Sequence, residues 1–198
     1  MIYKYAAVLV TTLSLAAVAY GQVVSNAAGA LRIASPRFKS YPGDRPTVFL
    51  LKSNGEVIAE LRALAGTASE LTSGRAEFNK ATRGVTATDG AALEITDGTK
   101  SVSVRADEIQ TGPRELAEKQ ASGERMFLLK SGGATIAELR VRASEAVSIE
   151  SANSSGHLEY STGTGTVVGR GGVILEVTAG TSSTSLRADE IESVSGSK

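Results

Sequence analysis

Residues Arg105–Ile109 read RADEI, and the same five letters return at Arg187–Ile191. In both places they follow a short alternating stretch that is typical of a strand, SVSV before the first and STSL before the second. Neighbouring side chains on a strand point to opposite faces, so the adjacent Asp and Glu would diverge instead of forming a catalytic pair. We therefore interpret RADEI as the closing strand of a repeated unit, with its alanine facing inward and its charges facing outward.

Two further pairs of segments support an internal repeat. Phe49–Arg62 reads FLLKSNGEVIAELR and Phe127–Arg140 reads FLLKSGGATIAELR, with 11 of 14 positions identical at an offset of 78 residues. Gly74–Ile109 aligns without a gap on Gly156–Ile191, at an offset of 82. The four extra residues of the second copy fall in a Ser-rich segment between Arg140 and Gly156, where we expect a surface loop.

The repeated segments carry strand and turn signals throughout. Ala91–Val104 alternates apolar and polar residues on both sides of an Asp97-Gly98 hairpin turn. Glu56–Leu64 also alternates, and the KSNG turn before it favours a strand although its residue types favour a helix. Lys39–Thr47, with two prolines and a glycine, predicts a turn, and Thr111–Arg125 predicts a loop or a short helical turn. The predicted fold class is all-β.

The N-terminus differs in kind from the rest. After the single Lys4 the chain is apolar up to Tyr20, and small residues occupy Ala19 and Gly21. This layout predicts a secretory signal peptide cleaved before Gln22; the alternative is an uncleaved membrane anchor. The predicted organisation is a signal peptide at 1–21, a first repeat at 22–110, a second repeat at 111–192 and a tail at 193–198.

Composition narrows the function. Lys and Arg total 21 and Asp and Glu total 21, so the chain has no basic excess to attract nucleic acid. Without cysteine it has neither disulfides nor a lipoprotein attachment site. The one histidine, His157, corresponds to Arg75 in the first copy, so the repeat requires no imidazole there. No His or Cys cluster has metal-ligand spacing, and the glycine-rich stretch Gly163–Gly172 is not followed by the Lys and Thr, opening a helix, that a phosphate loop needs. We predict no catalytic residue, no metal and no cofactor.

The apolar positions of the alternating strands are the candidate binding residues. They would form either a packed core or an apolar groove that holds a ligand, and the sequence leaves both open. The candidates are Phe78, Leu93, Ile95, Val102, Val104, Tyr160, Leu175, Val177 and Leu186.

Written as a repeat, the chain resembles the OstA-like (LptA-type) periplasmic lipopolysaccharide-transport family. The resemblance is carried by the strands AEF and LEY, by Gly90 and Gly172 before AALEI and VILEV, and by the closing VRADEI and LRADEI. It implies an open, V-shaped β-jelly roll whose apolar groove holds lipid acyl chains. It also implies a periplasmic transport bridge between the inner and outer membranes. The implied partners are lipopolysaccharide or a related lipid and other jelly-roll components, joined by edge-strand pairing, with self-association end to end.

Three alternatives stay open at this point. The protein could be a structural or adhesive exported β-repeat protein with a filled core. It could be an anchored member of the same transport system whose first segment is kept in the membrane. An enzyme would have to depend on His157, since the chain has no other imidazole.

Overall fold

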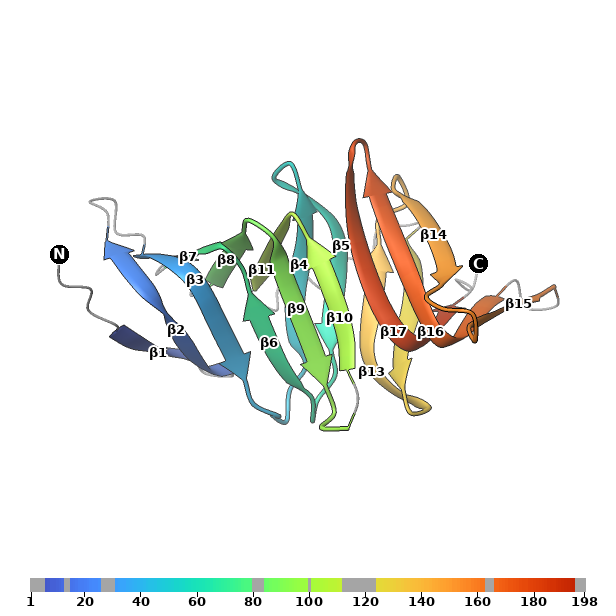
Figure 1. Cartoon of the computed structure of the whole chain (residues 1–198), viewed down its shortest axis with the longest axis horizontal. Coiled ribbons are helices and arrows are strands. Elements are labelled where there is room, and N and C mark those ends of the chain that lie inside the picture. The colour runs from blue at the N-terminus through green and yellow to red at the C-terminus, as the bar shows by residue number, and fades with distance from the viewer. Residues whose placement is uncertain are drawn as a thin grey trace.

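The computed structural model describes residues 6–12, 15–25, 31–79, 84–99, 101–111, 124–162 and 166–194. Within these ranges every regular element is a strand, and all strand pairs are antiparallel (Figure 1). The all-β prediction is therefore confirmed, including the strand at Glu56–Ala63 that its residue types made ambiguous.

The strands before and within the first repeat are β1 (Ala6–Thr12), β2 (Leu15–Ser25), β3 (Leu31–Ser40), β4 (Thr47–Ser53), β5 (Glu56–Ala63), β6 (Ala68–Thr72), β7 (Arg75–Asn79), β8 (Gly84–Thr88), β9 (Ala91–Thr96), β10 (Ser101–Ala106) and β11 (Glu108–Thr111). The strands of the second repeat are β12 (Arg125–Ser131), β13 (Ala134–Val141), β14 (Ala146–Ser151), β15 (His157–Ser161), β16 (Thr166–Ala179) and β17 (Ser182–Val194).

The strand pairings form two layers that share strands at both ends. One layer runs from β3 through β6, β9 and β10 to β17. The other runs from β3 through β7, β8, β11, β4, β5, β13 and β12 to the same β17. The antiparallel sheet is thus nearly closed on itself around one apolar core. In Figure 1, β1 and β2 extend it at one end, and β14, β15 and β16 extend it at the other.

RADEI is the place where the chain crosses from one layer to the other. In the first repeat β10 ends at Ala106, and β11 begins at Glu108 in the opposite layer. In the second repeat β17 continues through the crossing: its residues 185–187 pair with β10, and 190–194 pair with β12. Ala106 and Ala188 are both buried, which confirms the predicted inward alanine. The motif therefore closes one layer and also starts the other.

A second crossing lies between β8 and β9 and recurs inside β16. Asp89 and Gly90 have φ of 61° and 77°, and the aligned Gly171 and Gly172 have φ of 79° and 93°. These left-handed conformations favour Gly and tolerate Asp. In the second repeat they form an irregularity within one long strand, where the pairing with β17 shifts register between Arg170 and Val173.

The two repeats meet across a local pseudo-two-fold axis. Val104 pairs with Leu186 in the β10–β17 pair, and these residues occupy the same position of the repeat. Leu61 pairs with Leu139 in the β5–β13 pair, and these are also equivalent. All four side chains are fully buried, so the core is continuous across the junction. We call these two pairs of strands the seam.

Several sequence predictions concern connections. The turns at Asn54-Gly55, Asp97-Gly98 and 41–46 are confirmed. The expected loop of the second repeat connects β14 to β15 at 152–156. Most of Thr111–Arg125, residues 112–123, lies outside the described residues. The signal peptide stays a prediction, and in the structure 6–12 and 15–21 belong to β1 and β2, which pair with each other.

Truncating a leucine at the seam tests the shared core. Leu139→Ala should lower the free energy of unfolding by about 3 kcal/mol, because it removes a fully buried side chain that contacts both repeats. Leu158→Ala, on exposed β15, is the matched control and should cost less than about 1 kcal/mol. Urea unfolding of both variants measures the difference, and equal losses would contradict a core continuous across the seam.

Candidate functional site

The two acidic residues of RADEI contact the lysine and serine of FLLKS, which end β4 in the first repeat and β12 in the second. Buried Ser53 donates a hydrogen bond from Oγ to Oδ2 of Asp107 at 3.3 Å. Buried Ser131 donates the same bond to Asp189 at 3.3 Å. The two best-conserved segments of the repeat, FLLKS and RADEI, therefore contact each other in both copies. A buried hydroxyl needs such a partner, which explains the aspartate in structural terms.

The glutamates of RADEI form ion pairs with the lysines of FLLKS. The Lys52 Nζ lies 3.1 Å from Glu108, and the Lys130 Nζ lies 3.3 Å from Glu190. Since Asp and Glu have different partners on different sides of the strand, they do not converge on a common point. The interpretation of RADEI as structural, and not as a catalytic pair, agrees with this geometry.

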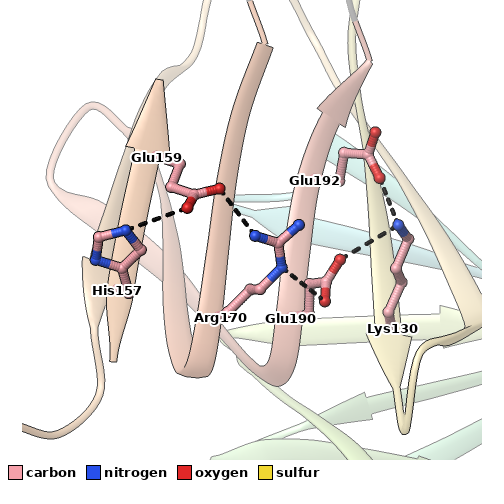
Figure 2. Close-up of polar contacts among 6 residues, drawn as sticks. All are labelled: Lys130, His157, Glu159, Arg170, Glu190 and Glu192. Atoms are coloured by element: carbon pink, nitrogen blue, oxygen red, sulfur yellow. Dashed lines mark hydrogen bonds and ion pairs between the residues drawn. The ribbon is translucent and has the colours of Figure 1, made fainter. Parts of the chain in front are cut away.

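The second repeat extends its ion pair into a network along the outer face (Figure 2). Lys130 also contacts Glu192. Arg170 lies 2.8 Å from Glu159 and 3.4 Å from Glu190, so it connects β15 to β17. Hydrogen bonding from Lys130 to Glu192 is the largest cause that raises the pKa of Lys130, while partial burial opposes it. Arg170 has Thr88 at its place in the first repeat, so the repeat architecture does not require the network.

His157, the only histidine, is the outermost member of that network. Its Nε2 lies 3.3 Å from Glu159, and its side chain is 67% exposed. Figure 2 shows the imidazole on the face of β15 that also carries Glu159. Because side chains alternate along a strand, Leu158 and Tyr160 lie on the other face. Among the described residues, the partner of the imidazole is the carboxylate of Glu159, at the exposed surface of β15.

Most of the predicted binding residues lie in the core. Seven of the nine candidates are at most 1% exposed and belong to one apolar cluster: Leu93, Ile95, Val102, Val104, Leu175, Val177 and Leu186. Phe78 is partly buried against this cluster. Tyr160 is the exception at 65% exposure. In this conformation the seven buried residues are covered by protein, so they present no surface to a ligand.

The equivalent strands of the two repeats differ in how they are covered. In the first repeat β3 pairs with both β6 and β7, and so joins the two layers at that end. In the second repeat the equivalent strands β14 and β15 pair only with β16 among the described residues. We call this end of the molecule, formed by β14, β15 and β16, the tail; it is distinct from the C-terminal segment 193–198. At the tail no described strand pairs with β14 and β15 in the way that β3 pairs with β6 and β7.

At the tail, apolar side chains of β15 are exposed. They lie on the face of β15 whose equivalent, on β7 of the first repeat, packs against the core. Leu158 is 43% exposed, whereas the aligned Ala76 is 1% exposed. Tyr160 takes the place of Phe78. Leu158 lies over Gly169, because a Cβ added at Gly169 would approach the leucine Cδ2 to 2.9 Å. These side chains therefore continue the inner surface of the sheet beyond the filled core.

Two residues of β14 belong to the same surface. Val147 and Ile149 pair with the core residues Val177 and Leu175 and pack partly buried against the core. Their equivalents in the first repeat are Ser69 and Leu71, both buried. We define the tail face as Val147, Ile149, Leu158 and Tyr160. Relative to the first repeat, serine becomes valine and alanine becomes leucine, so apolar volume increases where cover is lost.

Sequence reasoning found only one member of the tail face. Tyr160 was visible as the aromatic residue aligned with Phe78. Leu158 stands beside it in LEY and could have been identified from its alignment with Ala76. Val147 and Ile149 lie in the stretch where the two offsets of 78 and 82 residues disagree, so their partners became evident only from the strand register.

No helix in the described part of the chain is long and apolar enough to cross a membrane. The same residues contain no group of three or more His, Cys, Asp or Glu side chains that could hold a metal ion. Among the described residues, the tail face and the outer ion-pair network are two surface features in which the second repeat differs from the first at aligned positions.

The ion pairs of Lys130 give a testable difference between the repeats. Lys130→Met should lower the free energy of unfolding by about 1 kcal/mol, and Lys52→Met should lower it by less, since Lys52 has one carboxylate partner where Lys130 has two. Because the folded state raises the pKa of Lys130, its contribution is complete below the ordinary value of 10.5 and is lost as the pH rises through the folded-state value.

Urea unfolding of wild type, Lys130→Met and Lys52→Met at neutral pH and again well above pH 10.5 measures both effects. The gap between wild type and Lys130→Met should narrow at the higher pH. A gap that is unchanged by pH would mean that lost packing of the lysine side chain, and not its charge, causes the destabilisation.

Comparison with known proteins adds no relative from which a function could be transferred. No family model matches the chain, and neither a curated protein nor a solved structure matches it. The features of the chain that bear on its function are therefore the repeat, the tail face and the resemblance of the sequence motifs.

Proposed function

We propose that this protein is a non-enzymatic lipid-binding protein of the periplasm that passes lipopolysaccharide, or a related lipid, between the inner and outer membranes. The observation that carries the proposal is the tail face. It places four apolar side chains on the inner side of two strands, at positions whose equivalents in the first repeat are buried or partly buried. Leu158 and Tyr160 are exposed, and Val147 and Ile149 are partly buried beside them. An exposed apolar surface of this kind marks a binding site for a lipid or for another protein.

The chemistry of the tail face favours an acyl chain. Its side chains offer carbon surface and one phenol, while the charges of β15, His157 and Glu159, lie on the opposite face. Each methylene group that leaves water for such a surface gains about 0.8 kcal/mol. A ligand with long chains would therefore bind along the inner side, and its polar head would stay in solvent.

The proposal includes the finer architecture implied by the resemblance. The two layers would be an elongated jelly roll that opens into a V at the tail, where no described strand pairs with β14 and β15 on the side away from β16. Export would remove residues 1–21, and the edges of β14 and β15 would pair with other jelly-roll components or with a further copy of this chain. Unpaired strand edges support such association because their N–H and C=O groups lack partners.

A structural or adhesive protein with a filled core is the second candidate. Seven of the nine predicted binding residues are at most 1% exposed, which favours a core that is complete without a ligand. In that case the tail face would contact protein alone. Native mass spectrometry separates the two candidates, since only the lipid carrier should retain lipid after purification from cells.

Photocrosslinking tests the proposed lipid contact. A photoreactive phenylalanine analogue is placed at Tyr160 or Leu158, and the matched control carries it at Glu159, on the same strand but on the opposite face. After irradiation of cells, lipopolysaccharide adducts should form from positions 160 and 158 and not from 159. The same analogue at Ile95 reports on the filled centre and should give no adduct while the core stays closed.

Adducts of equal yield from all three β15 positions would show unspecific contact. No lipid adduct from Tyr160 or Leu158, in a variant that unfolds like the wild type, would overturn the lipid proposal and leave the filled-core candidate.

A further inference from the structure

The tail presents two free strand edges, one after the other along the same edge of β16. β14 and β15 each pair on one side with β16, and no described strand pairs with the other side (Figure 1). Edge strands of stable monomers are usually protected by lysine, proline, bulges or inward charges. β14, with the sequence AVSIES, has no lysine, proline or bulge; its one charge, Glu150, lies on the outer face, and its inward residues Val147 and Ile149 are apolar.

The opposite end of the molecule is not equivalent. There the outer edge of β3 is occupied by β2, and residues 22–25, which the proposed cleavage leaves in place, pair with 31–34 of β3. Cleavage would uncover residues 37–40 of β3, but that part of the edge carries Arg37 and Lys39 directly after Pro36, which can donate no backbone hydrogen bond. The edge of β14 carries no lysine or proline, so we take the same tail of a second copy as its partner.

Within one chain, the two repeats already pair edge to edge at two places. At the seam, β10 pairs with β17 and β5 pairs with β13, each antiparallel and each centred on equivalent residues of the two repeats. Two repeat units of this sequence thus pair edge to edge around a two-fold axis. A second copy that approaches the tail in the same manner makes an isologous contact, which closes after two subunits.

We propose that two copies of this protein form a two-fold dimer, tail to tail, by antiparallel pairing of β14 with its counterpart. A pairing centred on Ser148 sets Val147 of each copy beside Ile149 of the other on the inner side. The inner surfaces of both copies then form one continuous apolar strip, and Glu150 faces Ala146 of the other copy instead of a like charge. The contact uses backbone edges, so it does not depend on lipid.

Single cysteines test the geometry, because the chain has no cysteine of its own. In Ser148→Cys, the two thiols of a dimer centred on this residue lie within disulfide range, since directly opposed Cα atoms of antiparallel strands are about 4.5–5.5 Å apart. The control is Ser103→Cys, an exposed serine on β10, whose strand is paired on both sides. Under mild oxidation of lipid-free protein, Ser148→Cys should form a covalent dimer and Ser103→Cys should not.

Sedimentation of the wild type should give a species of twice the monomer mass that does not grow further with concentration. Val147→Lys, which places an inward charge on the edge strand, should weaken self-association on the order of tenfold or more while the subunit stays folded. A monomer at every concentration overturns the proposal. An open-ended series of larger species also overturns it, because that result requires head-to-tail contacts.

The two tests are separable. If Tyr160 crosslinks to lipid and the protein stays monomeric, lipid binding stands and the dimer fails. If the dimer forms without any lipid adduct, the dimer stands and the proposed lipid function fails.

Discussion

The structure depends on one crossing of the chain between two β-layers, made once in each repeat at RADEI. The crossing is held by a hydrogen bond from a buried serine to the aspartate and by an ion pair from a lysine to the glutamate. Alanine and isoleucine of the same motif face the core. Because four of its five residues contact the core or FLLKS, the identity of the motif is constrained by packing and polar pairing together.

The seam follows from these crossings. Each repeat exposes the same two strand edges, so the repeats pair through β10–β17 and β5–β13 about a pseudo-two-fold axis. Fully buried leucine and valine at the centre make one core out of two units. The arrangement is symmetric at the seam and asymmetric at the ends, because β3 covers the first repeat and no described strand covers the second in the same way. The proposed lipid-binding surface lies at the tail, where the two repeats differ.

Much of the fold was predictable from particular residues. The alternation of Leu93, Ile95, Val102 and Val104 predicted strands with one buried face, and the Asp97-Gly98 turn placed the hairpin between them. The inward alanine of RADEI was also predictable. The binding surface was not, since alternation shows which side chains share a face but not whether another strand covers it. Leu175 and Leu158 look alike in the sequence, yet one is fully buried and the other is 43% exposed.

The sequence by itself determined the strands, their turns, the duplication and the inward and outward sides of each strand, because these follow from local periodicity and from identity between the copies. Only the tertiary structure decided that the two layers close around a filled centre, that the repeats are related by a pseudo-two-fold axis, and that Leu158 and Tyr160 are exposed at the tail. The reason is physical: strand pairing joins residues far apart in the chain, so the change from Ala76 to Leu158 does not by itself show whether another strand covers the side chain.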